Sequence, residues 1–293
     1  MPELPEVETI KNDLKQAILG KKITQVTVKD EKIVKNQSAE FVKILKGNRI
    51  EDLSRIGKLL IFKLGREELY LLIHLKMTGQ LVFVAGDRII AGGHQDQRSK
   101  TSFFSEIEAE GKHTRIIFEF SNGAKLFFND LRRFGYAKIV NAEELKIVAG
   151  AYGPEPLSKV FTKEALGITL KGKKAPVKAI LLNQGLIAGI GNIYADEALF
   201  AAKIRPDRKA ESLTSEEVKR LAEAIKMILK KAIKFRGTTF SNYRDASGRK
   251  GNFSRLLKVY GKDGEICPCC RKTKLKKIKV AGRGTVVCEN CQK

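Results

Sequence analysis

The feature that most restricts the fold of this chain is a group of cysteines near its C-terminus. Cys267 and Cys270 are separated by two residues, Cys288 and Cys291 repeat that spacing, and 17 residues lie between the two pairs. Each pair can offer two thiolates from one tight turn, and two such turns complete a tetrahedron around zinc. Because four sulfurs leave no open coordination position, we expect one structural Zn²⁺ whose binding folds the tail.

The fifth cysteine, Cys269, creates rival pairings with its neighbours. Only Cys267 with Cys270 has the two-residue spacing, so Cys269 is expected to be a spare. A redox dithiol is the competing interpretation of the cluster. A disulfide framework is not indicated, because all 5 cysteines lie after residue 266 and none is spread through the rest of the chain.

The charge of the chain indicates an anionic partner. There are 56 Lys+Arg against 33 Asp+Glu, a formal net charge of +23, which is typical of proteins that bind nucleic acid. An anionic membrane is the second candidate, but no segment combines a basic helical face with bulky apolar anchors. No apolar run is long enough to span a bilayer, and the N-terminus lacks the pattern of a secretory signal. We therefore expect a cytoplasmic protein that does not bind membranes.

The first half of the sequence reads as one helix followed by short strands. After Pro5, apolar residues recur at helical spacing from Val7 to Leu14, and Gly20 can stop the helix. Strand-like runs begin at residues 23, 58, 68, 80, 115 and 124, and SNG at 121–123 reads as a hairpin turn. This order predicts an antiparallel sandwich or barrel. The polar, Gly-rich stretch 85–112 predicts a long loop or insertion.

The second half is predicted to be helical. Thr214 and Glu217 form a capping box for a helix that ends at Gly237, and a shorter helix follows the Gly-rich turn AGIGN at 188–192. In the tail, KVAGRGT at 279–285 suits a hairpin tip that presents the Arg283 guanidinium to a phosphate, with a solvated turn as the alternative.

These patterns define the expected domains and fold class. An N-terminal domain spans 1–150, a linker punctuated by Gly-Pro spans 151–160, a helical domain spans 161–262, and a four-cysteine finger spans 263–293. The predicted class is α+β.

The N-terminus carries residues suited to covalent chemistry. Removal of Met1 would expose Pro2 as a secondary amine, and the reference pKa of an α-amino group, about 8, leaves a useful neutral fraction near pH 7. Such an amine can attack an aldehyde-level carbon and form an iminium. Glu3 could shuttle protons, and Glu6 lies one helical turn further on. Taken alone, a helix that simply starts with Pro and Glu is the better interpretation.

The motifs of the whole chain resemble those of formamidopyrimidine-DNA glycosylase, a bacterial base-excision-repair enzyme. They are PELPEVET (2–9), DLRRFG (130–135), GPEPL (153–157), AGIGNIYADEALF (188–200), VYG (259–261) and the cysteine tail, in that order. The resemblance covers residues 2 to 292 apart from the stretch around 85–112. It implies an N-terminal helix with an antiparallel β-sandwich, a helix–two-turns–helix domain and a zinc-finger β-hairpin.

The resemblance also implies a reaction and its catalytic residues. Pro2 matches the nucleophile that attacks the deoxyribose anomeric carbon as the damaged base leaves. Glu3 matches the acid that protonates the sugar ring oxygen, and Glu6 matches a supporting acid. Lys58 matches the lysine that holds the phosphate beside the lesion. The resulting Schiff base would undergo β- and δ-elimination, which cuts the strand.

Other positions match residues of the family that hold DNA. Met77, Arg132 and Phe134 match the wedge that replaces the flipped nucleotide, and His74 matches a DNA contact, although a satisfied strand histidine is about equally expected. Lys76 stands where the family usually has glycine. Asn192 can cap the helix after the Gly-rich turn and donate to phosphate, and Tyr260 matches a phosphate contact. Residues 238–255 match a lesion-capping loop, in which Thr238, Phe240, Ser241, Asn242 and Tyr243 occupy the reading positions.

The expected function is a bifunctional DNA glycosylase and AP lyase for oxidised purines (8-oxoguanine and formamidopyrimidines) in double-stranded DNA. One flipped base needs one chain, so we expect a monomer. The nearest alternative is an endonuclease VIII-like enzyme for oxidised pyrimidines, which the N-terminal PELPE and the wedge residues disfavour. The second alternative is a noncatalytic zinc-finger protein that keeps only the scaffold.

Overall fold

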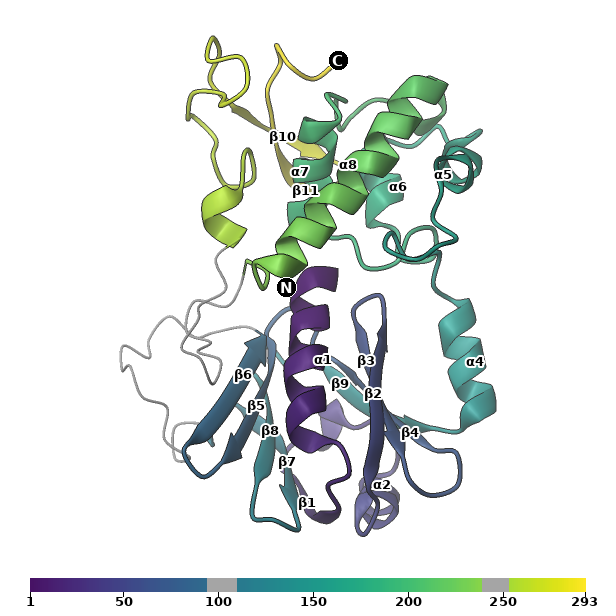
Figure 1. The fold of residues 1–293 in the computed structure, drawn as a ribbon, viewed down its shortest axis with the longest axis vertical. Coiled ribbons are helices and arrows are strands. Elements are labelled where there is room, and N and C mark those ends of the chain that lie inside the picture. The colour runs from purple at the N-terminus through teal and green to yellow at the C-terminus, as the bar shows by residue number, and fades with distance from the viewer. Residues whose placement is uncertain (94–109, 239–252) are drawn as a thin grey trace. The chain divides into compact units, whose positions relative to one another are not determined.

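The protein, in a computed structural model that describes residues 1–93, 110–238 and 253–293, divides into two units (Figure 1). Unit 1 consists of Met1–Ala149 with Phe235–Asn252, of which 235–238 are described in the second segment. Unit 2 consists of Gly150–Lys234 with Phe253–Lys293. The chain therefore leaves unit 1 near the end of α4 (Ala142–Gly150), and it returns after α8 (Ser215–Lys234).

Unit 1 begins with helix α1 (Leu4–Ile18), as its apolar spacing predicts. Pro5 is tolerated in the first turn, where a backbone N–H has no helical partner. Val7, Ile10 and Leu14 are all buried, and Gly20 adopts a positive φ of 73° just after the helix ends. The helix therefore presents one apolar face to the sheets and stops where glycine permits the turn.

Two antiparallel sheets form the rest of unit 1. The five-stranded sheet has the order β1-β7-β8-β5-β6, and the four-stranded sheet has the order β2-β3-β4-β9. The strands are β1 (Ile23–Val28), β2 (Ile50–Ile56), β3 (Leu59–Leu64), β4 (Tyr70–His74), β5 (Gly79–Ala85), β6 (Arg88–Gly93), β7 (Thr114–Phe120), β8 (Lys125–Asp130) and β9 (Tyr136–Val140). One core contains residues of both sheets and of α1, including Phe62 and Phe118, so the predicted sandwich is confirmed.

Several elements of unit 1 escaped the sequence analysis. The prediction that 85–112 is a loop was wrong at its start, because Arg88–Gly93 forms β6 and pairs with β5 through a turn at Gly86. Residues 94–109 lie outside the described part. Helix α2 (Ser38–Leu45), the 3₁₀ turn η1 (Glu31–Ile33), β2, β9 and α4 were not predicted either. Helix α4 has no buried residue, and such a helix offers little apolar periodicity to detect.

Unit 2 is helical around its own core. Its elements are α5 (Lys163–Leu170), α6 (Val177–Leu182), α7 (Asn192–Ala201), the 3₁₀ turn η2 (Ala210–Ser212), α8 (Ser215–Lys234) and the 3₁₀ turn η3 (Phe253–Leu256). The predicted capping box of α8 is confirmed: the Thr214 N–H donates to Glu217 Oε2 at 2.9 Å, and the Glu217 N–H donates to Thr214 Oγ1 at 3.3 Å. Among the described residues, no helix is long and apolar enough to cross a bilayer.

The chain ends in a β-hairpin of β10 (Lys276–Val280) and β11 (Arg283–Val287). Val280 pairs with Arg283, and the two residues between them, Ala281 and Gly282, both have positive φ. That geometry is the tight two-residue turn that matches the twist of a hairpin. The prediction of a hairpin tip beside Arg283 is therefore confirmed, and the Arg283 residue is exposed there.

Candidate functional site

The N-terminal residues predicted to act as nucleophile and acids are buried together at the start of α1. Pro2 is buried, and Glu3 and Glu6 are 2% and 0% exposed. The Glu3 backbone N–H donates to Glu6 Oε2 at 2.9 Å, which satisfies a donor at the first turn of the helix. A chain terminus ordinarily frays, so this contact holds Pro2 and Glu3 in place.

The other oxygen of Glu6 holds a segment more than two hundred residues away in the sequence. Glu6 Oε1 accepts from the Thr238 N–H at 2.8 Å and from the Thr238 hydroxyl at 3.1 Å. Gly237 packs so closely that a Cβ there would lie 2.5 Å from Glu6 Oε1, and its φ is +76°. Arg236 also contacts α1, at 2.5 Å from Asp13. Of the predicted capping-loop residues, Thr238 thus lies beside Glu6, whereas Phe240, Ser241, Asn242 and Tyr243 lie outside the described residues.

Lys58 lies with Gly57 in the tight turn between β2 and β3, and Arg55 links this turn to α1. Arg55 Nε donates to Glu8 Oε2 at 2.6 Å, and Arg55 Nη1 donates to the Gly57 carbonyl at 3.2 Å. Burial alone would raise the pKa of Glu8, but Lys11 and Arg55 together lower it, so the carboxylate stays charged. Lys58 is 5% exposed, which is unusual for lysine. The contact through Arg55 was missed from the sequence, which predicted no strand at this arginine.

His74 ends strand β4, and the strand register places it near Lys58. Leu59, the residue after Lys58, pairs with His74, and His74 pairs in turn with Tyr136 of β9. Burial lowers the pKa of His74 to about 3, and the charges of Lys76 and Lys58 act in the same direction. Its Nδ1 accepts the Lys76 N–H at 3.0 Å. The neutral ring must therefore carry its proton on Nε2.

The two loops that carry the predicted wedge are adjacent because β5 pairs with β8. Gly79, two residues after Met77, pairs with Asp130, which precedes the loop of Arg132 and Phe134. Met77 and Phe134 are 37% and 52% exposed. The Arg132 guanidinium lies 4.6 Å from the centroid of the Phe134 ring, a cation–π distance. Exposed apolar side chains at this spot fit a surface that inserts into a partner, and core packing is excluded for both.

Asp130 positions both wedge loops, and the sequence analysis did not identify it. Its carboxylate accepts the Thr78 hydroxyl, the Gly135 N–H at 2.7 Å and the Arg132 N–H at 3.2 Å. Asp130 is 0% exposed, so each of these bonds is made away from water. An acidic residue at the end of an apolar strand was visible in the sequence, but its partners depend on the pairing of β5 with β8.

In unit 2, the Gly-rich turn between α6 and α7 is held by Gln184. Its amide donates to the Ile190 carbonyl at 2.9 Å, and its oxygen accepts the Gly189 N–H at 2.9 Å. The expectation that Asn192 caps the next helix was wrong, because Gly191 occupies the cap position and no side-chain cap bond is made there. The Asn192 amide instead donates to the Gly284 carbonyl at 3.1 Å. Asn192 therefore ties the start of α7 to the hairpin that carries Arg283.

A buried ion pair strengthens the same junction. Lys178 of α6 and Asp196 of α7 are 0% and 1% exposed and lie 2.6 Å apart. Lys178 Nζ also donates to the Thr285 hydroxyl at 2.6 Å. Burial raises the pKa of Asp196 to about 6, against the influence of Lys178. This network was missed because lysine and aspartate in a helical segment read as solvated residues.

The backbone at Tyr260 is positioned by another buried carboxylate of unit 2, that of Glu197. Glu197 of α7 is 1% exposed, and its Oε1 accepts the N–H groups of Lys258, Val259 and Tyr260 at 2.9 to 3.0 Å. These three hydrogen bonds to one carboxylate fix the backbone from Lys258 to Tyr260, which includes the first two residues of the VYG motif. The sequence carried no signal for this contact beyond the nearness of Glu197 to the Gly-rich turn.

The four predicted ligand cysteines come together in the tail. Their Sγ atoms all lie within 4.8 Å of one another. Cys267 and Cys291 are 3.8 Å apart, and Cys270 and Cys288 are 3.7 Å apart. A tetrahedron with metal–sulfur distances of about 2.3 Å places its sulfurs about 3.8 Å apart. The four cysteines could therefore hold a metal ion in closed coordination, whereas Cys269 is exposed and outside the group.

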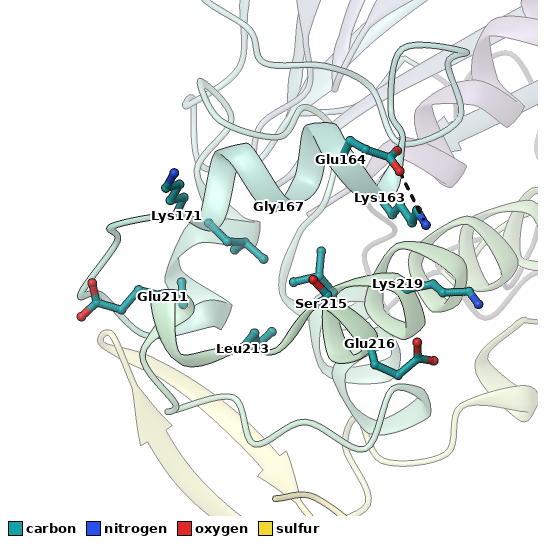
Figure 2. A pocket seen from close by; sticks show the side chains of 12 residues that line it. Lys163, Glu164, Gly167, Lys171, Glu211, Leu213, Ser215, Glu216 and Lys219 are labelled. Carbon is teal, nitrogen blue, oxygen red and sulfur yellow. Dashed lines mark ion pairs between the residues drawn. The ribbon is translucent and has the colours of Figure 1, made fainter.

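One hollow of unit 2 contains none of these residues. A pocket of about 480 Å³ lies between α5 and the start of α8 (Figure 2). Lys163, Lys171 and Lys219 line it, and so do Glu164, Glu211 and Glu216. Charges of both signs balance there, so the pocket offers no preference for an anionic ligand.

Comparison with known proteins agrees with this geometry. Residues 1–137 match the model of the formamidopyrimidine-DNA glycosylase N-terminal domain, and residues 152–244 match the H2TH domain of the same enzymes. The formamidopyrimidine-DNA glycosylase of Carboxydothermus hydrogenoformans is 42% identical over 100% of both chains. That of Pelotomaculum thermopropionicum is 40% identical over 100% of this chain and 99% of its own.

Solved structures give the same result. A mutant of the Lactococcus lactis Fpg bound to DNA that contains Fapy-dG matches with a TM-score of 0.85, 33% identity and 100% coverage of both chains. The same enzyme bound to DNA with an abasic site matches with a TM-score of 0.85, 32% identity and 99% coverage of both chains. These matches define a class of protein, the DNA-repair glycosylases that carry an H2TH domain. The chain belongs to the formamidopyrimidine-DNA glycosylase family.

The burial of His74 predicts a pH-dependent stability. The pKa of His74 in the folded protein, about 3, lies below its unfolded value, so the unfolded chain binds the proton first as the pH falls. The free energy of unfolding should therefore decrease below about pH 6.5, by about 2 kcal/mol at pH 5 from this residue. In His74→Asn, whose amide oxygen can still accept the Lys76 N–H, this decrease should be absent. Urea unfolding between pH 5 and pH 8 measures it, and parallel curves for both proteins would contradict the assignment.

The buried pair in unit 2 makes a second prediction. Lys178→Ala leaves Asp196 buried without its cation, so the free energy of unfolding should fall by about 3–5 kcal/mol. The double variant Lys178→Met with Asp196→Leu removes both charges and should recover most of that loss. Urea unfolding followed by circular dichroism compares the three proteins. Equal stability of Lys178→Ala and wild type would show that the pair contributes nothing.

Proposed function

We propose that the protein is a bifunctional DNA glycosylase and AP lyase that removes oxidised purines and then nicks the strand. The observation that carries the proposal is the burial of Pro2 beside Glu3 and Glu6 at the start of α1. Hydrogen bonds from the Glu3 and Thr238 N–H groups to the Glu6 carboxylate hold this helix start in place. A buried, fixed proline at the N-terminus suits a nucleophile that must meet one carbon atom of a sugar.

The reaction uses the N-terminal amine after Met1 is removed. The Pro2 nitrogen attacks the deoxyribose anomeric carbon, and the bond to the damaged base breaks with its electron pair leaving on the base. The nitrogen then loses its proton, Glu3 donates a proton to the sugar ring oxygen, and the nitrogen lone pair forms the iminium C=N bond as the bond from the anomeric carbon to the ring oxygen breaks. Loss of the phosphates at the β and δ carbons then cuts the strand on both sides. Glu6 keeps Pro2 and Glu3 in position through its hydrogen bond with the Glu3 N–H.

The remaining predicted residues hold the DNA. Lys58 and His74, brought together by the register of β3 with β4, would contact the phosphate beside the lesion. Met77, Arg132 and Phe134 would fill the space left by the flipped nucleotide, since they are exposed on adjacent loops. Asn192, Tyr260 and Arg283 would contact other phosphates of the duplex. One chain supplies every group, so we propose that it acts as a monomer.

The choice among lesions follows the family relatives. The Lactococcus lactis enzyme has been seen with DNA containing Fapy-dG and, as the wild-type protein, with DNA containing an oxidised pyrimidine. We therefore propose oxidised purines as the main substrates and oxidised pyrimidines as secondary ones. A purely noncatalytic DNA-binding role would not require Pro2, Glu3 and Lys58 all to be present, as they are in this chain.

Borohydride trapping tests the enzymatic proposal. The processed protein should form a covalent adduct with duplex that contains 8-oxoguanine opposite cytosine, because borohydride reduces the iminium to a stable amine. Pro2→Gly should bind the duplex normally and give far less adduct. Glu3→Gln should lower the rate of base excision by about 100- to 10,000-fold, and Glu40→Gln, which removes an exposed carboxylate on α2, is the matched control. Absence of an adduct with 8-oxoguanine and with an abasic site would refute the lyase activity.

We also propose that the four cysteines bind one Zn²⁺ with a structural role. Thiolate ligands in closed tetrahedral coordination are typical of zinc, which would supply folding energy to the tail. Metal analysis should find about one equivalent of zinc per chain. Cys288→Ser should lose the metal and DNA affinity, whereas Cys269→Ser should keep both. Folded, DNA-competent protein without zinc would overturn the proposal.

A further inference from the structure

A hollow in unit 1 is lined mainly by cations and contains none of the predicted catalytic residues. It has a volume of about 330 Å³, and its lining consists of Lys22, Gly47, Arg49, Glu51, Gly65 and Arg66. Three cations therefore face one acid. The pocket in unit 2 is different, because three lysines face three glutamates there. The imbalance makes the hollow of unit 1 suitable for an anion.

Backbone hydrogen bonds bring the three cations together from separate segments. Lys22 and Arg49 form an antiparallel bridge, and the Gly65 N–H donates to the Arg49 carbonyl at 2.9 Å, which places Arg66 beside them. The backbone positions of the three cations are therefore fixed by hydrogen bonds, and their exposed side chains line the hollow. A phosphate prefers such a fixed group of donors to scattered surface lysines.

Two of the guanidinium groups are also restrained. Arg49 Nη1 donates to the Gly20 carbonyl at 3.0 Å. The Arg66 guanidinium packs over Gly47, and a Cβ on Gly47 would lie 3.6 Å from it. The single acid, Glu51, is 3.3 Å from Lys63, so part of its charge is already compensated. Arginine presents a fork that matches phosphate oxygens, and restraint lowers the entropy lost on binding.

The hollow lies at the opposite end of unit 1 from the catalytic residues. Helix α1 starts beside Pro2 and ends before Gly20 (Figure 1), and its 15 residues span about 22 Å. The hairpin of β2 and β3 agrees with this, because Lys58 lies in its turn while Arg49 and Arg66 flank its open end. With 7 residues, β2 spans about 23 Å. A DNA segment at Pro2 and Lys58 is therefore separated from these cations by the length of the sandwich.

We propose that Lys22, Arg49 and Arg66 form a second anion site that takes backbone phosphates of a further DNA segment, so that one protein molecule holds two segments at once. The contacts are to phosphate alone, so this second segment is bound without regard to sequence or damage. A protein that keeps one segment while it touches another can pass between them without full dissociation. The inference rests on the proposed function only for the segment that occupies the catalytic end.

The test uses protein whose catalytic end is already filled. Borohydride-trapped adduct with a short abasic-site duplex is titrated with a second, undamaged, fluorescent duplex. The wild-type adduct should bind it, and the adduct of Arg49→Ala with Arg66→Ala should bind it at least about tenfold more weakly, with the slope of log affinity against log salt smaller by about 2. The control is the double variant Lys171→Ala with Lys219→Ala, which removes two positive charges at the unit 2 pocket. Its adduct should bind the second duplex as tightly as the wild-type adduct does.

The outcomes separate this inference from the proposed function. Failure to form any adduct counts against the lyase mechanism. If the adduct forms but its wild-type form binds no second duplex, or if Arg49→Ala with Arg66→Ala binds as well as wild type, the second site is wrong. The last measurement adds inorganic phosphate at a concentration equal to that of the phosphate groups in the second duplex. It should not displace the second duplex, and displacement would assign the hollow to a small free anion and overturn its assignment to DNA.

Discussion

The carboxylate of Glu6 is the contact on which the arrangement of the N-terminal site depends. One of its oxygens holds the Glu3 backbone, and the other holds Thr238. A buried carboxylate is stable only when its oxygens accept hydrogen bonds, so the fold must bring both segments to it. Gly237 must be glycine for the same reason, since a side chain there would occupy the space of Oε1. The need to satisfy both oxygens of Glu6 thus fixes the residues at the start of α1 and holds Thr238 beside them.

The same solution recurs at the loops that carry the proposed DNA contacts. Asp130 accepts hydrogen bonds from both wedge loops, and Glu197 accepts three successive amides before Tyr260. Each is an acid in a strongly basic chain, and each is buried. The positive charge supplies attraction to DNA of any sequence, whereas these buried acids set the geometry of the loops that carry the proposed DNA contacts.

The sequence was sufficient for the features that depend on local pattern. Helical spacing gave α1 and α8, the capping residues Thr214 and Glu217 marked where α8 begins, and cysteine spacing gave the ligand group. It was insufficient for contacts made across the fold. Asn192 reads as a helix cap, but it bonds to the hairpin of the tail, because its true partner is 92 residues away. The roles of Asp130 and Lys178 depend likewise on strand pairing and helix packing that no short window contains.

The fixed tautomer of His74 has a consequence for the way DNA is held. Because its Nδ1 accepts the Lys76 N–H and its ring stays neutral, Nε2 is a hydrogen-bond donor that carries no net charge. Binding by lysine and arginine displaces counterions and weakens as salt rises. A neutral donor displaces none, so a bond from His74 to a phosphate would persist at ionic strengths that loosen the rest of the interface. The protein would then keep its register on the strand after most of its nonspecific attraction to DNA had been screened.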